Sequence, residues 1–314
     1  MAAGTEILTG TGVREANAAK EGWPRIALVT PVYNSGRYIE QTIRSVLAQS
    51  YPNLDYFIVD GGSTDNTLEV IRKYEGEISG WVSEPDKGMY DAINKGFART
   101  SGEIMGWISA TDQLHIGGLS VVGSIFRDFM EVEWITARRT VFNEEGVMVR
   151  VDPLMRWSRY RFLLGASNRH IQQEATFWRR SLWERAGGQV DAAWRYASDF
   201  ELWARFFRHA QLYTVDSLIG GFREHGDSDS LQQATRFNGR CDEIARAELR
   251  AEKLGWIMDK LLRLDATLGR VPKVRFFWYN AKKVLLRGLY EIPGPDWPPV
   301  IKYDRILQSW KIEG

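Results

Sequence analysis

Two spacings of apolar residues alternate along the first third of the chain. Short apolar runs, typical of buried strands, occupy residues 25–33, 54–59, 78–82 and 103–108. Between these runs apolar residues recur every three or four positions, which predicts helices over 38–48, 63–74 and 88–100. Strands that alternate with helices favour a parallel sheet with right-handed crossovers. This part of the chain is therefore predicted to be an α/β unit.

The pattern loosens beyond residue 112. Helical spacing recurs over residues 119–130, 157–164, 181–186 and 199–209. Strand-like runs follow at 132–140, 147–151 and 211–215. Helical patterns then cover 231–268 and 273–290, before an irregular proline-rich tail. We expect three parts, which are a mobile leader at 1–24, an α/β domain at 25–230 and a helical C-terminal extension at 231–314.

Composition narrows the class of protein. The chain has 314 residues, of which 44% are hydrophobic and 26% charged, as in an ordinary soluble protein. Its net charge of +1 gives no electrostatic reason to expect a nucleic-acid partner. A single cysteine, Cys241, excludes an intrachain disulfide and fits a reducing compartment. No apolar run approaches the roughly 20 residues of a membrane span.

One carboxylate stands where open α/β sheets usually bind ligands. The strand-like run at 103–108 continues into a small polar loop that contains Asp112. The carboxyl end of a buried strand is the position at which such sheets place their ligand chemistry. Asp112 is therefore a candidate for holding a divalent cation against a diphosphate. The alternative is that Asp112 only caps the helix that follows.

Two other loops follow predicted strands. Asp60 opens the loop DGGSTD and could accept hydrogen bonds from a base or ribose, although the loop could equally be a turn and helix cap. Lys87, in the loop EPDKG, could neutralise a phosphate at the start of the next helix. Asn94 lies on that helix. The alternative reading of this segment is a solvated, capped helix.

Several motifs in one order resemble a known enzyme family. The segments TPVYN, VDGGSTDNT, SEPDKGMYDAINKG, GEIMGWISATD, QQEATFWRRSLWERAGG and SDFELWARFF are similar to those of family 2 glycosyltransferases. The resemblance covers roughly residues 25–230. It implies the GT-A fold, which is Rossmann-like with a mainly parallel sheet and flanking helices. It also implies a hexosyltransferase-type enzyme that moves a sugar, with inversion, from a nucleotide diphosphate sugar to a hydroxyl acceptor.

The resemblance implies a role for residues at the ends of the first strands. The donor side would consist of Pro31, Tyr33, Asp60, Asp86, Lys87, Asn94, Thr111 and Asp112. Asp112 matches the second carboxylate of an acidic motif that binds Mn²⁺ or Mg²⁺ beside the diphosphate, and His225 resembles a late metal ligand. Thr111 stands where the family usually has the first carboxylate. A threonine can hydrogen-bond a ribose or a metal-bound water, but it brings no charge.

The acceptor side is expected from later segments. Asp199 takes the position of the family's base, which removes the proton from the attacking hydroxyl. Gln172, Gln173 and Trp178 match a segment that lines the acceptor side. Trp178 and Trp203 could stack on a sugar or lipid, or could fill the core.

Alternatives to this function remain at the level of sequence. A nucleotide-sugar-binding protein without catalysis is favoured by Thr111. A nucleotidyltransferase would need a glycine-rich basic loop after the first strand, and residues 34–37, NSGR, match one poorly. Residues 270–290 form a basic amphipathic pattern that could lie on an anionic membrane near a lipid-linked acceptor, or pack on the domain. The expected setting is surface polysaccharide assembly on the cytoplasmic face of a membrane.

Overall fold

The computed structural model describes residues 22–164, 170–226, 234–251 and 298–314, with isolated residues between 260 and 281. The predicted leader lies almost wholly outside these residues. The predicted alternation of strands and helices up to residue 108 is confirmed. The elements are β1 (Ile26–Val32), α2 (Ile39–Leu47), β2 (Leu54–Asp60), α3 (Thr67–Lys73), β3 (Gly80–Ser83), α4 (Met89–Phe97) and β4 (Ile104–Trp107).

The second half contains shorter strands. Its elements are β5 (Gln113–Leu114), α5 (Gly118–Asp128), β6 (Trp134–Thr136), β7 (Thr140–Phe142), β8 (Met148–Val151), α6 (Arg159–Leu164), β9 (Phe177–Arg179), α7 (Arg180–Arg185), α8 (Ser198–Phe206), β10 (Leu212–Val215), β11 (Gly220–Arg223) and α10 (Ala234–Arg250). The single strand expected over 132–140 is two strands, which join different sheets. Strands β9 and β11 were not expected.

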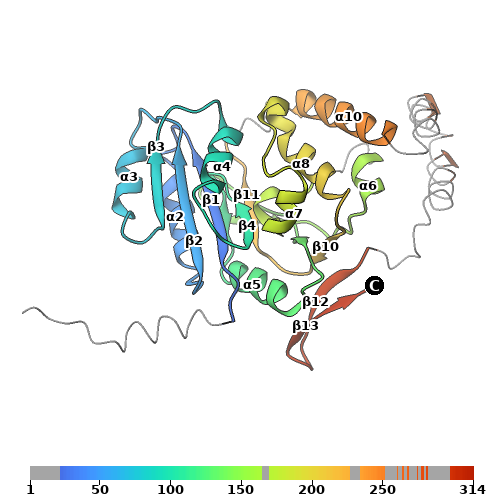
Figure 1. Cartoon of the computed structure of the whole chain (residues 1–314), viewed down its shortest axis with the longest axis horizontal. Coiled ribbons are helices and arrows are strands. Elements are labelled where there is room, and N and C mark those ends of the chain that lie inside the picture. The colour runs from blue at the N-terminus through green and yellow to red at the C-terminus, as the bar shows by residue number, and fades with distance from the viewer. Residues whose placement is uncertain are drawn as a thin grey trace, which may run out of the picture.

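The described residues form a main sheet of nine strands. Strands β12 (Val300–Asp304) and β13 (Ser309–Glu313) lie at one edge of this sheet. The strand order is β13-β12-β10-β6-β9-β4-β1-β2-β3. Most neighbours are parallel, but β9 runs antiparallel to both β4 and β6. A second sheet has the order β5-β11-β7-β8. Figure 1 shows helices packed around the central strands, in agreement with the predicted mainly parallel α/β fold.

The prediction of a helical extension over 231–314 is wrong for its last residues. Val300 and Ile301 are fully buried, and they pair with Thr214 and Val215 of β10. This partner lies far away in the sequence, so local periodicity could not reveal the strand. The predicted amphipathic helix at 270–290 falls largely outside the described residues. Among the described residues, none of the helices combines the length and apolar character that crossing a bilayer requires.

Successive side chains of β1 pack into two hydrophobic layers, one on each face of the sheet. Leu28 faces the layer formed with α2, α3 and α5, whereas Val29 faces the layer formed with α4, α7, α8 and α10. In the second layer, helix α4 packs very closely against β1. A Cβ atom on Gly96 would come within 2.4 Å of a methyl carbon of Val29, so only glycine allows this approach. This packing fixes α4, whose N-terminus faces the candidate site, against the sheet.

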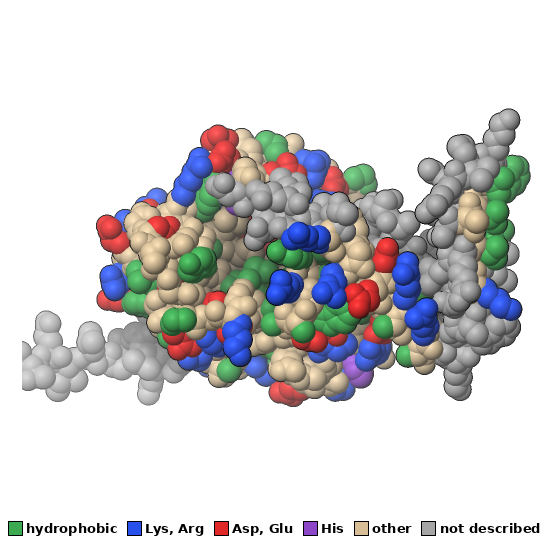
Figure 2. Space-filling view, turned by 90° about the horizontal axis from the view of Figure 1, so that it is seen from above, with side chains coloured by type: hydrophobic (Ala, Val, Ile, Leu, Met, Phe, Trp, Pro, Cys, Tyr) green, Lys and Arg blue, Asp and Glu red, His purple; other side chains and the backbone are tan. Residues whose placement is uncertain are grey.

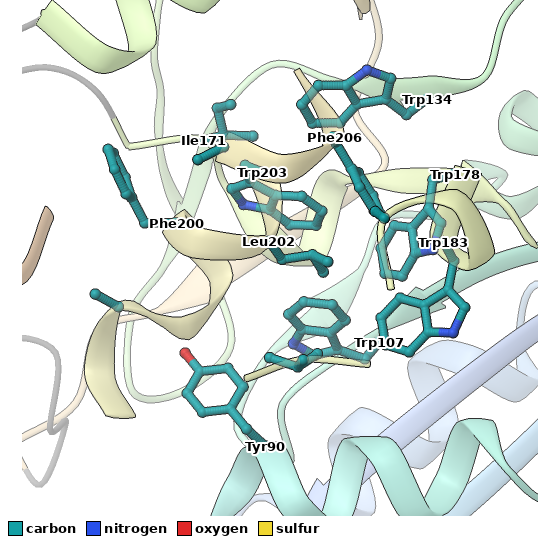
Figure 3. Packing of buried hydrophobic residues seen from close by; sticks show 14 of the residues in the cluster. Tyr90, Trp107, Trp134, Ile171, Trp178, Trp183, Phe200, Leu202, Trp203 and Phe206 are labelled. Carbon is teal, nitrogen blue, oxygen red and sulfur yellow. The ribbon is translucent and has the colours of Figure 1, made fainter. Parts of the chain in front are cut away.

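Tryptophan side chains build the centre of the second layer (Figure 3). The indole of Trp203 on α8 stacks on that of Trp107 on β4, with ring centroids 5.7 Å apart and planes inclined by 9°. Trp178 on β9 packs edge-on against Trp203 at 5.5 Å. Trp178 is 0% and Trp203 1% exposed, so the core role is correct and the predicted acceptor-side role is not. The layer anchors α8 to the sheet.

Candidate active site

Asp60 ends β2 and holds the loop that follows it. The carboxylate is completely buried, and Oδ2 accepts hydrogen bonds from the backbone N–H groups of Gly62 and Ser63, both at 3.0 Å. Oδ2 also accepts from the hydroxyl of Ser83 at 2.6 Å, and Oδ1 accepts from the hydroxyl of Ser63 at 2.5 Å. The carboxylate predicted to bind a base or ribose is therefore engaged in shaping the loop. A ligand would meet the loop rather than this buried side chain.

Asp86 occupies the space beside the same loop. A Cβ atom on Gly61 would lie 2.6 Å from Asp86 Oδ2, so the absence of a side chain at Gly61 leaves room for this carboxylate. Asp86 Oδ1 accepts the N–H of Gly88 at 2.7 Å. Gly88 has a φ of +112°, which favours glycine, and precedes α4. Asp86 is only partly buried, and Lys87 next to it is exposed. The partly exposed carboxylate at this edge is thus Asp86, not Asp60.

The loop after β1 is tied to the loop after β2. Asn34, at a φ of +45°, accepts the N–H of Thr64 at 2.8 Å and donates its own N–H to the Ser63 hydroxyl at 2.8 Å. Pro31 is buried within β1, and Tyr33 is 60% exposed beside this junction. Of the predicted donor-side residues, the structure brings Tyr33, Asp86 and Lys87 to the surface of one sheet edge.

Asn94 does not face a ligand. Its Nδ2 donates to the carbonyl of Val190 and its Oδ1 accepts the Val190 N–H, both at 2.8 Å. Both ends of the amide are used, so Asn94 ties α4 to the segment that leads into α8. The predicted donor-side role gives way to a positioning one.

Asp112 lies buried at the end of the β4 loop, with 2% of its surface exposed. Oδ1 accepts the backbone N–H of Arg223 at 2.9 Å. Burial raises the pKa of this carboxyl well above its usual value, the negative charge of Glu174 raises it further, and the Arg223 N–H opposes both. Helix α5 begins six residues later, after Gly117, and has no side-chain cap. The alternative that Asp112 merely caps this helix is therefore excluded.

The described residues offer a cation a partial ligand set. They contain no group of three or more His, Cys, Asp and Glu side chains arranged to hold a metal ion. Mg²⁺ commonly binds through one or two carboxylates together with substrate phosphates, so Asp112 fits a cation that a diphosphate would complete. His225 follows β11, two residues beyond Arg223, and its ring lies 4.9 Å from that of Tyr38. A carboxylate together with phosphate oxygens suits Mn²⁺ or Mg²⁺.

Asp199 occupies the first turn of α8. Its Oδ1 accepts the N–H of Phe200 at 2.7 Å, and burial raises the pKa of the carboxyl to about 6. Burial raises the pKa of the Tyr90 phenol on α4 well above its usual value, and the charge of the nearby Asp199 raises it further. Glu201, two residues along, forms two 2.8 Å hydrogen bonds with Arg205. Asp199 is thus the carboxylate in this turn that is not bound by arginine.

Glu174 is a buried acid that the sequence reasoning missed. It is 4% exposed, and burial raises its pKa to about 7. The charge of Glu174 raises the pKa of Asp112, and the charge of Asp199 raises the pKa of Glu174. The Glu174 carboxyl is therefore close enough to both candidate site carboxylates to interact with them. Gln172 donates to Glu174 Oε1 at 2.6 Å. The residue stands inside the quoted motif QQEA, which was the available signal.

The glutamines predicted for the acceptor side support this turn. Gln172 exchanges two hydrogen bonds with the backbone of Thr140, at 2.9 and 2.7 Å. Gln173 donates to the carbonyl of Trp107. Both side chains are more than nine-tenths buried, so they hold Glu174 and the end of β4 in place and do not present their amides to an acceptor.

Glu174→Gln is expected to change how stability depends on pH. Because the folded-state pKa is raised, the folded protein binds this proton more tightly, and its stability falls as the pH rises from about 4.5 to about 7. The variant lacks that loss. We expect its melting temperature to exceed that of the wild type at pH 8 but not at pH 5, measured by scanning fluorimetry. The exposed Glu69→Gln serves as control, and equal differences at both pH values would contradict the assignment.

Comparison with known proteins agrees with these features. Residues 27–185 match the pattern that defines Glycosyl transferase family 2. The chain belongs to this family. The protein is therefore a glycosyltransferase enzyme, and the family resemblance drawn from its motifs is confirmed. Rv1514c, an uncharacterized glycosyltransferase of Mycobacterium tuberculosis, is 28% identical over 211 residues, which cover 65% of this chain and 76% of that protein.

Solved structures confirm the GT-A fold of this glycosyltransferase. TarS residues 1–349 of S. aureus, in complex with UDP-GlcNAc, superimpose with a TM-score of 0.61 at 15% identity, covering 85% of this chain and 82% of that one. The chain spans 42% of a longer TarS structure. Mannosyltransferase PcManGT of Pyrobaculum calidifontis, in complex with GDP-Man and Mn²⁺, gives a TM-score of 0.50 at 16% identity, with coverages of 90% and 96%. GT-A neighbours thus bind nucleotide sugars and, in one case, a divalent metal.

Proposed function

We propose that this glycosyltransferase moves a sugar from a nucleotide diphosphate sugar to a hydroxyl acceptor with inversion at the anomeric carbon. The observation that carries the proposal is the pair of carboxylates Asp112 and Asp199, which come from different halves of the chain and each accept a backbone N–H through Oδ1. Both lie within electrostatic reach of Glu174. One carboxylate can serve a cation and the other a proton. The UDP-GlcNAc and GDP-Man complexes of the neighbours support a nucleotide sugar as donor.

The donor side follows from the exposed loops. Tyr33 and the glycine loop after β2 would meet the base and ribose, and Asp86 Oδ2 can accept a hydrogen bond from a base N–H. The exposed ammonium of Lys87 can approach a phosphate. Asp112, with His225, would hold Mn²⁺ or Mg²⁺. When bound, the cation offsets negative charge on the departing diphosphate.

The chemical step assigns the proton to Asp199. As the acceptor oxygen forms its bond to the anomeric carbon, Asp199 takes the hydroxyl proton, and the bond from that carbon to the phosphate oxygen breaks on the opposite face. The electron pair leaves with the diphosphate. A pKa of about 6 leaves the carboxylate mostly ionised at neutral pH yet more basic than an ordinary aspartate. A single displacement of this kind gives inversion.

The acceptor class is proposed to be a glycan or lipid-linked saccharide of surface polysaccharide assembly. Lys and Arg side chains gather near the middle of the face that lies on top in Figure 1 (Figure 2). A basic surface favours an acceptor with phosphate or other negative charge. In the segment predicted to touch a membrane, Phe277 is 74% exposed, while Trp278 packs against the aromatic core. Peripheral contact through 270–290 stays part of the proposal.

A panel of UDP-, GDP- and dTDP-sugars tests the function directly. Binding and hydrolysis are measured with Mn²⁺, with Mg²⁺ and with EDTA. Turnover of one donor, lost in Asp112→Ala, would support the proposal and name the nucleotide. Donor binding without turnover, even with crude lipid acceptor, would favour the non-catalytic binding protein instead. Release of pyrophosphate from a sugar phosphate and a nucleoside triphosphate would point to a nucleotidyltransferase.

Asp86→Asn is expected to weaken donor binding about tenfold, because a charged acceptor of a hydrogen bond is lost. The asparagine oxygen can still accept the Gly88 N–H, so the melting temperature should stay within about 1 °C of the wild-type value. Isothermal titration with the preferred nucleotide sugar measures the change. Asp128→Asn is the control, because it changes a surface carboxylate on a different element, helix α5. Unchanged affinity in Asp86→Asn would remove Asp86 from the donor site.

A further inference from the structure

Arg223 is a buried cation whose guanidinium is not hydrogen-bonded to a carboxylate, although the charge of the buried Asp112 acts on it. The side chain is completely buried at the end of β11, yet it makes no ion pair with any described carboxylate. Its Nε donates to the carbonyl of Thr111 at 2.6 Å, and its Nη1 donates to the carbonyl of Glu144 at 2.8 Å. Its guanidinium carbon lies 5.2 Å from the centre of the Tyr38 ring. Buried charges are costly unless they are paired, so this arrangement is incomplete.

The incomplete part is a specific atom. Nη2 is buried and has no hydrogen-bond partner among the residues that the structure describes. In a planar guanidinium, Nε and Nη2 share one edge, and here Nε of that edge already points to Thr111. The unpaired donor is therefore on the edge that faces the loop of Asp112. The opposite side, at Nη1, is covered by the turn between β7 and β8, since a Cβ atom on Gly146 would lie 3.3 Å from Nη1.

We infer that Nη2 of Arg223 binds an oxygen of the donor's diphosphate beside Asp112. The inference rests on the proposed function, and it adds a fixed positive charge to the site. The diphosphate of a nucleotide sugar carries two negative charges and Asp112 a third, while a divalent cation and Arg223 together supply three positive charges. Arg223 also positions Asp112, because its backbone N–H donates to Oδ1 of that carboxylate. Thr111 contributes its carbonyl to this arrangement instead of a carboxylate.

Calorimetric titration of Arg223→Gln with UDP, GDP, uridine and guanosine, with and without Mn²⁺, tests the inference. We expect about 10- to 150-fold weaker binding of the nucleoside diphosphate that the wild type prefers, which corresponds to a lost charged hydrogen bond. The matching nucleoside should bind within about twofold of wild type, because it has no phosphate. Arg179→Gln is the control, since Arg179 donates to the backbone carbonyls of Val132, Phe126 and Phe129 elsewhere in the fold.

The outcomes separate this inference from the proposed function. If the wild type binds neither UDP nor GDP, the proposed function fails. If the wild type binds one of them and Arg223→Gln binds it equally well, Nη2 is satisfied by water and the inference is overturned. If Arg223→Gln does not fold, as judged by its melting curve, Arg223→Lys takes its place. This variant keeps the positive charge but lacks the paired N–H donors of the guanidinium. Arg223→Lys should still bind the nucleoside diphosphate more weakly than the wild type does, while its affinity for the nucleoside should be unchanged. Wild-type affinity of this variant for both ligands would refute the assignment.

Discussion

Asp199→Asn is expected to lower kcat by about 10²- to 10⁴-fold while the protein stays folded. The asparagine oxygen can still accept the Phe200 N–H, so the start of α8 keeps its hydrogen bond, but the side chain no longer takes a proton. Steady-state assays with the preferred donor, together with donor affinity by titration, measure the two effects. Affinity for the nucleotide sugar should change by less than about threefold.

The nearby Asp191→Asn is the matched control. Asp191 accepts the N–H of Ala193 and caps a short turn, a task that asparagine can also perform, so turnover should persist. Full activity in Asp199→Asn would eliminate this residue as the base. The pH profile gives a second check. Because the base must be ionised, kcat/KM should fall about tenfold per pH unit below about 6 and level off above it.

Trp203→Ala is expected to lower the free energy of unfolding by about 3–5 kcal/mol. The side chain is 1% exposed and packs on Trp107, Trp134 and Trp178, so its removal leaves a large cavity. Urea unfolding followed by circular dichroism measures the change. Because α8 carries Asp199, kcat should also fall at temperatures where the variant is still folded.

Trp203→Phe distinguishes packing from hydrogen bonding. The indole nitrogen of Trp203 is buried without a partner, so phenylalanine loses ring area but no hydrogen bond. Its cost should therefore be well below that of alanine. Trp310→Ala, in the edge strand β13, is the control and should cost less because that side chain is partly exposed. A loss smaller than about 1 kcal/mol in Trp203→Ala would show that α8 is held by other contacts.

Local sequence patterns predicted the N-terminal half of the fold. They did not predict strands whose partners lie far away in the sequence. Strand β1 could be predicted from its continuous apolar run and helix α2 from its helical spacing, because each pattern extends over seven or more residues. Strand β11 reads GGFR, and glycine is rare in strands, while β9 runs without a break into α7, so neither shows the pattern of a strand. Strand β12 depends on β10, about 85 residues earlier, which no local window contains.

The candidate site shows the same division. Asp112 and Asp199 could be found because each stands in a motif at the start or end of an element. Burial could not be read for charged residues, so Glu174 and Arg223 looked like ordinary surface charges. Of the two carboxylates predicted for the donor side, Asp60 is enclosed by backbone N–H groups and Asp86 remains partly exposed. That fact is set by tertiary geometry and not by residue type.

The antiparallel strand β9 has a mechanical consequence. It hydrogen-bonds to β4 on one side and β6 on the other, so the strands of the N-terminal and C-terminal halves of the chain share one uninterrupted sheet. A hinge between the halves would have to break these ladders, unlike the hinge between separately folded lobes. Motion that admits substrates and frees products would then fall to loops that follow the strands, such as the one after β3, where Lys87 and Gly88 are exposed. Turnover in this enzyme would be gated by loops moving over a stiff platform.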